Sequence, residues 1–296
     1  GDWGDIWFVK KNRPVMVRTD GTVDYELNHE NHALKLNGGA SDITKTSYGG
    51  NAMSEIPLIW VKRWTQNNYH FVVFCEEQYD DTYKAYAHTD ADGNVLPVTY
   101  FPMYEGSVVN SRMRSLSGLT PTASMTDEQE TTAAKQNGDR WDKQSFSEIN
   151  LMYEMCTMIT CSTNSQGKFG NGNSQSDNFL QTGTLNGKGQ FFGYTSTTQA
   201  VKVFYCENFF ANYWKRLRGL LLINGVYHVK AVPPYNSTGA GYTNTGLTPS
   251  GTSGGYCSRM EMASDIGRIP TVASGSETTY ECDGLWFNNT IVAVAL

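Results

Sequence analysis

The sequence predicts a protein of the α+β class. Short strand-like runs are separated by turns, two segments carry helix-capping signals, and long polar loops fill the C-terminal half. With 296 residues, of which 39% are hydrophobic and 12% aromatic, the chain is long enough to bury a sizeable core. That length allows one large domain or two ordinary ones.

The first half of the chain predicts several strands. Residues 6–10 and 14–18 are strand-like, and Asp20-Gly21 predicts a hairpin turn before a strand over residues 22–27. The later run "NYHFVVFCEEQY" has a continuous apolar centre, which is typical of a strand buried on both faces. The paired carboxylates that follow it, Glu76-Glu77 and Asp80-Asp81, predict solvated edges or turns.

Two helices follow from local sequence signals. Thr126 with Gln129, or Asp127 with Glu130, predicts a capping box for a helix that ends near Gly138. A second capping box, Ser145 with Glu148, begins the segment "FSEINLMYEMCTMITC". That segment carries an apolar stripe that predicts a buried helix face, made of Ile149, Met152, Met155, Cys156 and Ile159.

The C-terminal half predicts short strands between long loops. Residues 201–206 and 226–232 are strand-like, and "CENFFANYWKRLRGLLLING" predicts a short helix and a strand with Trp214 packed inward. The loop over residues 233–256 is rich in Gly, Ser, Thr, Asn and Tyr, and loops of this length in a compact protein are functional or disordered. Residues 291–296 are almost continuously apolar and predict a core strand in the centre of a sheet.

Composition argues against several partner classes. The net charge is −6, and no long run of Lys and Arg occurs. Electrostatic binding to nucleic acid or to an anionic membrane is therefore not expected. No stretch of 18 or more apolar residues is present, which predicts no membrane insertion. The six cysteines are widely scattered and are expected to be free thiols.

Several motif-like stretches are better explained as turns. The tract Gly183–Gly189, "GTLNGKG", is one residue short of a phosphate-binding loop and has Gly where Ser or Thr belongs, which favours a flexible turn. Asp90-Ala91-Asp92-Gly93 lacks the remaining ligands of a calcium loop. His29 and His32 lie three residues apart without an evident third ligand, so no metal site is expected there.

Many strings along the whole chain resemble a widespread family of bacteriophage tail and minor structural proteins. They include "DGTVDYELN", "IPLIWVKRW", "KAYAHTDADG", "TGTLNGKGQFFGY", "VKVFYCENFF", "GYTNTGLTPSGTSGGY" and "ASGSETTYECDGLWFNN". The resemblance implies a C-type-lectin-like fold of the formylglycine-generating-enzyme branch, similar to the variable proteins of diversity-generating retroelements. Such a fold joins a small antiparallel sheet to two helices and long polar loops.

The resemblance also implies a domain organisation. Residues 1–40 are expected to form N-terminal strands that lead into a C-type-lectin-like domain over residues 41–296, from which the last strand of the family is absent. The enzyme of that branch works through a cysteine pair with no equivalent around Cys257 or Cys282, so no catalytic residue, cofactor or enzymatic activity is expected.

The function implied is attachment of a phage virion to its host. We expect a tail-tip, fibre or head-fibre protein, assembled in the host cytoplasm, that binds a bacterial surface glycan or protein and forms a homo-oligomer with other virion proteins around it. A structural or decoration protein without a receptor is the alternative, and a glycan- or peptide-processing enzyme is a third. The expected ligand-binding residues lie in the C-terminal loops, where aromatic rings and adaptable polar side chains suit recognition. They are Tyr235, Tyr242, Tyr256, Trp286, Asn288 and Asn289.

Overall fold

The computed structural model describes residues 3–173, 179–193, 199–210, 212–250, 255–276, 278–279, 284–285 and 292–295. Within this part of the chain the protein is of the α+β class, with small antiparallel sheets and four α-helices. The chain divides into two units that are interleaved along the sequence. Unit 1 comprises Gly1–Ile56, Tyr100–Lys143 and Phe169–Tyr213, and unit 2 comprises Pro57–Thr99, Gln144–Lys168 and Trp214–Leu296. The predicted division at residue 40 stays a prediction.

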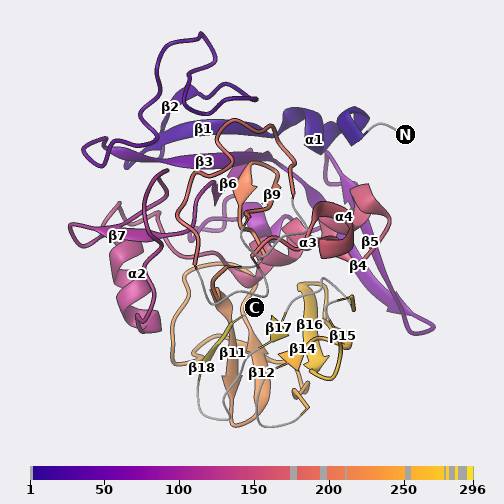
Figure 1. The fold of residues 1–296 in the computed structure, drawn as a ribbon. Coiled ribbons are helices and arrows are strands. Elements are labelled where there is room, and N and C mark those ends of the chain that lie inside the picture. The colour runs from indigo at the N-terminus through magenta and orange to yellow at the C-terminus, as the bar shows by residue number, and fades with distance from the viewer. Residues whose placement is uncertain are drawn as a thin grey trace. The chain divides into compact units, whose positions relative to one another are not determined.

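Unit 1 is built on a four-stranded sheet with strand order β2-β1-β3-β6, in which β1, β2 and β3 lie side by side (Figure 1). Its core packs Met16 of β1 and Ala52 of β3 against Leu27, Tyr104 and other buried side chains. The elements assigned to this unit are η1 (Trp3–Asp5), α1 (Trp7–Lys11), β1 (Arg13–Arg18), β2 (Val23–Glu26), β3 (Gly50–Pro57), β6 (Val98–Pro102), β7 (Ser107–Val109), β8 (Arg112–Arg114), α2 (Asp127–Lys135), β9 (Lys202–Val203) and β10 (Cys206–Glu207). The predicted strands at residues 14–18 and 22–27 are therefore confirmed.

The prediction of a strand over residues 6–10 was wrong, because this segment forms helix α1. Phe8 and Val9 are adjacent and both buried. Adjacent side chains point to opposite faces of a strand, whereas one turn of helix brings them to the same side. A short segment with a single buried side is therefore better satisfied as a helix.

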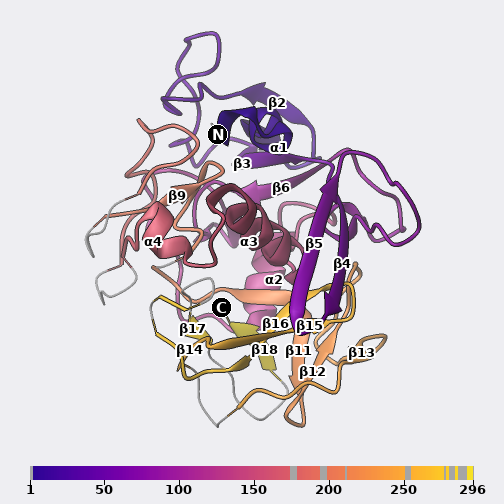
Figure 2. The ribbon, with the colours of Figure 1, turned by 90° about the vertical axis from the view of Figure 1, so that its right-hand side faces the viewer.

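Unit 2 contains a second four-stranded sheet, with strand order β13-β12-β11-β18. It also contains the long two-stranded ribbon β4-β5, drawn in purple in Figure 2. The elements of this unit are β4 (Trp60–Gln66), β5 (Tyr69–Cys75), η2 (Tyr86–His88), α3 (Phe146–Thr160), α4 (Ser165–Phe169, which ends in unit 1), β11 (Arg216–Ile223), β12 (Val226–Val229), β13 (Thr243–Asn244), β14 (Gly255–Tyr256), β15 (Arg259–Ala263), β16 (Gly267–Val272), β17 (Gly284–Leu285) and β18 (Val292–Ala295).

Both predicted capping boxes are confirmed. Thr126 and Gln129 cap α2, and Ser145 and Glu148 cap α3, each with the two reciprocal side-chain to backbone hydrogen bonds. The predicted apolar stripe of α3 is buried throughout. In unit 2 this helix packs against β11, β16 and η2. Local capping chemistry therefore fixes where both helices begin.

Two predictions for the C-terminal half were wrong. No helix forms between residues 207 and 210 or 212 and 215, since Asn208 and Asn212 adopt left-handed backbone angles (φ 52° and 66°) that interrupt a helix. Strand β18 confirms a strand near the end of the chain, but it lies at the edge of its sheet rather than in the centre. Among the described strands of that sheet, β11 and β12 occupy the centre instead.

Among the described residues, no helix combines the length and the apolar character needed to cross a membrane.

Candidate functional site

The β4-β5 ribbon is a regular hairpin whose two faces have different roles. Asn67 and Asn68 form its turn, both with positive φ (51° and 64°), which matches the twist of the flanking strands. The register runs without a bulge from the pair Gln66↔Tyr69 to the pair Trp60↔Cys75. Side chains therefore alternate strictly between one face and the other.

The inner face of the ribbon is anchored within unit 2. The Arg63 and Glu154 side chains, 3% and 2% exposed, form a bidentate ion pair with two N–O distances of 2.7 Å. Arg63 also donates a hydrogen bond to the carbonyl of Asp265 (3.2 Å). Nearer the tip, the His70 ring lies 3.1 Å from the carbonyl of Met260. These contacts fix the ribbon to α3 and to the β15-β16 hairpin.

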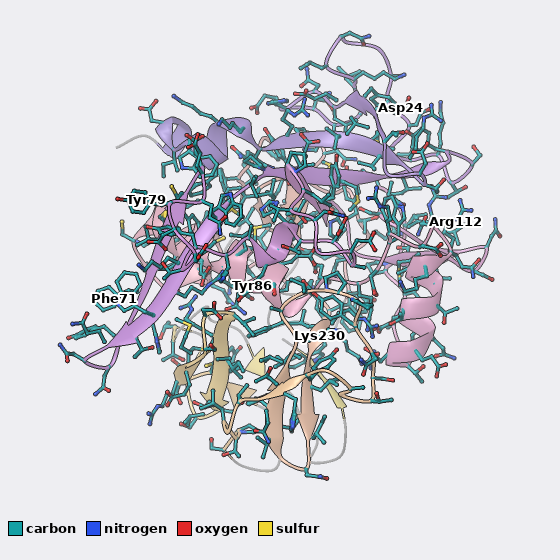
Figure 3. All side chains as sticks on the ribbon, turned by 180° about the vertical axis from the view of Figure 1, so that it is seen from behind. Asp24, Phe71, Tyr79, Tyr86, Arg112 and Lys230 are labelled. Atoms are coloured by element: carbon teal, nitrogen blue, oxygen red, sulfur yellow. The ribbon has the colours of Figure 1, made fainter. Side chains whose placement is uncertain are left out.

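The outer face of the ribbon is aromatic and open to solvent. Tyr69 is 70% exposed, and Phe71 and Val73 are each more than one third exposed. Phe71 stacks on Trp64 of the neighbouring strand, with ring centroids 4.9 Å apart and an interplanar angle of 10°. Figure 3 shows Phe71 and Tyr79 projecting outward on the same side of the molecule. We call this surface, made of Lys62, Trp64, Tyr69, Phe71, Val73, Tyr79 and Tyr83, the ribbon face.

The prediction that this strand is buried on both faces was therefore wrong. The sequence places apolar residues on both faces of β5, but the described part of the chain covers only the face of Val72 and Phe74. A usable signal was present in the sequence: the pair Asn67-Asn68 between two alternating runs predicts a two-stranded hairpin. Two strands alone rarely cover both of their faces.

A lysine occupies the centre of the ribbon face. The Lys62 ammonium lies 5.8 Å from the centroid of the Trp64 ring and 5.7 Å from that of Tyr83. Tyr83 in turn meets Tyr79, which is 81% exposed, in an edge-to-face contact at 6.2 Å. The cation is thus held by aromatic ring faces.

Acidic side chains border the ribbon face. Glu76, Glu77, Asp80 and Asp81 are all exposed, as predicted. Hydrogen bonds from the Thr82 hydroxyl and backbone lower the pKa of the Asp80 carboxyl, and the positive charge of Lys62 lowers this pKa further. Asp80 therefore carries negative charge at neutral pH and interacts electrostatically with Lys62.

The loop tyrosines predicted to bind ligand are directed inward. Tyr235 is half-buried; its hydroxyl donates to the carbonyl of Ala231 (3.4 Å), and its ring faces the Arg218 guanidinium at 6.0 Å. Tyr242 is also half-buried, and its hydroxyl donates to the carbonyl of Asn236 (2.9 Å). These contacts brace the loop.

The third predicted tyrosine lies beside an exposed tryptophan. Tyr256 of β14 pairs with Gly284 of β17, and a Cβ atom at Gly284 would lie 2.8 Å from the Trp214 ring. Trp214 is 61% exposed, so the prediction that it packs inward was wrong. Trp286, Asn288 and Asn289 lie outside the described residues. The predicted binding residues thus stay a prediction, to which Trp214 is added.

The phosphate-loop-like tract is a turn that encloses an internal carboxylate. The backbone N–H groups of Gly183 and Leu185 and the hydroxyl of Thr184 all donate to the Glu207 carboxylate. Burial raises the pKa of Glu207, whereas these three donors and the buried Lys202 favour its ionised form. The donors that a phosphate would use are therefore already occupied by a side chain of this chain.

The other motif-like stretches are structural. The Asp90 carboxylate accepts hydrogen bonds from the backbone of Asp92 and Asn94, which confirms a turn. Burial lowers the pKa of His32 to about 3, and its ring contacts the carbonyl of Asn28. In the described part of the chain, no three His, Cys, Asp or Glu side chains gather as metal ligands would. Cys75, Cys161 and Cys206 carry free thiols, and Cys282 lies outside the described residues.

Neither a protein-family model nor a curated protein sequence matches this chain.

Proposed function

We propose that this protein is a bacteriophage virion component that attaches to the bacterial surface, and that the ribbon face is its recognition surface. The observation that carries the proposal is the exposure of Tyr69, Phe71 and Tyr79 on a ribbon that a buried ion pair holds in place. The sequence resemblance to phage tail proteins supplies the biological setting.

The geometry of the ribbon suits recognition for two physical reasons. Tyrosine and tryptophan offer large contact area at a low cost in side-chain entropy, and the ring stack of Trp64 and Phe71 is formed before any ligand arrives. Because the ion pair of Arg63 with Glu154 already fixes the ribbon, ligand binding loses less conformational entropy. A preformed aromatic face on a fixed ribbon is the arrangement expected of a binding protein.

The proposal includes a finer fold and an assembly state. The small antiparallel sheets and the helices α2 and α3 are compatible with a C-type-lectin-like fold. We further propose a homo-oligomer, located in the virion after assembly in the host cytoplasm, with a host surface glycan or protein as the partner.

Adsorption of virions to host cells tests the recognition surface. The double variant Tyr69→Ala/Tyr79→Ala should slow adsorption by about tenfold or more if the two rings act as aromatic anchors. Leu36→Ala is the matched control, because Leu36 is an apolar side chain 56% exposed in unit 1, outside the ribbon. Normal adsorption by the double variant, with virions assembled as usual, would contradict the proposal.

A structural role without receptor binding is the second candidate function. It is favoured by the loop over residues 233–256, whose Tyr235 and Tyr242 hydroxyls are bonded within the loop region rather than presented to solvent. Virions that lack the protein would then fail to assemble, whereas loss of a receptor-binding protein leaves assembled particles that do not adsorb.

A further inference from the structure

The ribbon face contains a complete site for a positively charged group, and Lys62 occupies it. The ammonium lies between the Trp64 and Tyr83 rings at 5.8 and 5.7 Å from their centroids. Distances below about 6 Å are those at which a cation is attracted by the ring quadrupole. The exposed carboxylate of Asp80 is close enough to sense the charge of Lys62. Two aromatic walls and an anion together define the site.

We propose that the ribbon face binds a saccharide that carries a protonated primary amine, and that the ligand amine takes the place of Lys62 between Trp64 and Tyr83. This inference rests on the proposed function, because it names the ligand class of the same surface. Lys62 is only partly buried on β4, so its flexible side chain can return its ammonium to water when a ligand amine displaces it.

The charge of the surroundings selects for a cationic ligand. Glu76, Glu77, Asp80 and Asp81 are four exposed carboxylates within six residues, directly after β5. Asp80 of this group interacts with the charge of Lys62, and an amine that displaces Lys62 would meet the same carboxylate. A neutral saccharide would leave Lys62 in place, and an acidic one would be repelled by the border.

The size and shape of the ribbon face favour a saccharide over a protein partner. A stable protein interface buries about 800 Å² on each side, contributed by about 20–30 residues. The ribbon face consists of seven side chains, of which Tyr69 and Tyr79 are the most exposed. Separate open rings of this kind offer flat apolar faces to sugar rings, and the amides of Gln66, Asn67 and Asn68 lie beside them in sequence to bond hydroxyl groups.

Two oligosaccharides that share one backbone, with amines that are free in one and acetylated in the other, test the proposal. Glucosamine oligomers carry free amines in slightly acidic buffer, and N-acetylglucosamine oligomers have the same backbone without charge. Titration calorimetry with the full chain should give about tenfold tighter binding of the amine form, and added salt should weaken that binding. Lys62→Gln removes the internal competitor and should tighten binding of the amine form by about threefold, whereas Asp80→Asn should weaken it.

Several outcomes would overturn the inference. Equal binding of the two oligomers, no binding of either, or weaker binding of the amine form by Lys62→Gln would each show that Lys62 is not a displaceable occupant. Equally tight binding of a lysine oligopeptide would assign the site to a basic protein segment instead. Because these titrations use purified protein, they are separate from adsorption: a Tyr69→Ala/Tyr79→Ala virion that adsorbs normally refutes the proposed function whatever the titrations give.

Discussion

The β4-β5 ribbon and the loop over residues 233–256 both carry aromatic side chains, yet they present them in opposite ways. In the ribbon, Tyr69 is 70% exposed and Phe71 is 38% exposed. In the loop, Tyr235 and Tyr242 are half-buried, and their hydroxyls donate to backbone carbonyls of the same region. Aromatic content alone therefore does not identify a binding surface.

The difference has a physical origin. Strict alternation along a strand sends every second side chain outward whether or not anything covers it. An irregular loop has no such constraint, and its carbonyl groups need donors, which a tyrosine hydroxyl supplies. Regular structure can thus hold a ring in water, whereas the loop that carries Tyr235 and Tyr242 folds these rings back onto its own backbone.

The largest expected effect concerns the anchor of the ribbon. Glu154→Gln leaves the Arg63 charge buried without its carboxylate, and should lower the free energy of unfolding by about 3–5 kcal/mol. Chemical denaturation measures this. Replacement of both partners, Arg63→Met with Glu154→Leu, is the control and should cost much less, because no buried charge remains. A loss below about 1 kcal/mol in Glu154→Gln would show that the ribbon is held by other contacts.

The anchor of the loop is expected to depend on a glycine. Gly219 has φ 78°, and a Cβ atom there would lie 2.6 Å from the carbonyl oxygen of Lys230 and 2.9 Å from the Tyr235 ring. Gly219→Ala should cost about 2–4 kcal/mol of stability from backbone strain and overlap together.

Gly225 provides a matched control for this strain. Its φ is 79°, but nothing lies within 4 Å of a Cβ atom placed there. Gly225→Ala should therefore cost only the backbone term, about 1–2 kcal/mol. Equal melting temperatures for the two variants would indicate that the contact between Tyr235 and Gly219 does not support the loop.

Single tyrosine substitutions separate presentation from bracing. Tyr235→Ala should lower stability by about 1–3 kcal/mol, since it removes the contacts with Gly219 and Arg218. Tyr79→Ala should change stability by less than about 0.5 kcal/mol, because the ring is largely in water. Adsorption to host cells should be slowed more by Tyr79→Ala than by Tyr235→Ala. The reverse pattern in either assay would exchange the roles of the two regions.

The smallest expected effect is a change in the pKa of Asp80. Hydrogen bonds from Thr82 and the charge of Lys62 hold the pKa of Asp80 below its ordinary value. In Lys62→Gln this pKa should rise, but it should stay below that value because the Thr82 hydrogen bonds, which are the larger cause, remain. NMR measurement of the Asp80 carboxyl chemical shift as a function of pH gives its pKa in the unmodified protein and in Lys62→Gln. An unchanged pKa would show that Lys62 does not interact with the Asp80 carboxyl.

Sequence signals predicted the elements whose chemistry is local. The capping boxes of α2 and α3 are confirmed residue by residue, because each requires only side chains three positions apart. The β1-β2 hairpin followed from its turn residues in the same way. These elements depend on neighbours in the chain rather than on distant packing.

The pair Asn67-Asn68 signals the hairpin, but the sequence could not show which face of the ribbon stays open or that Trp214 is exposed. Whether an apolar side chain is covered depends on which segments lie over it, and that is decided by tertiary packing. Phe71 and Val72 are adjacent apolar residues of one strand, yet only Val72 lies on the anchored face. The sequence specifies that both faces of β5 are apolar, and the fold decides which one remains open.

The turn around Glu207 limits how this protein can change over time. Gly183, Thr184 and Leu185 take their arrangement from a carboxylate that β10 supplies from more than twenty positions further along the chain. A relative in which position 207 is apolar would leave the buried N–H of Leu185 without its acceptor, at a cost of about 1–3 kcal/mol, and would also remove the acceptor of the less buried Gly183 and Thr184 donors. Because two of the three donors are backbone N–H groups that remain whatever the side chain, we expect relatives that keep this turn to retain an acceptor side chain at position 207.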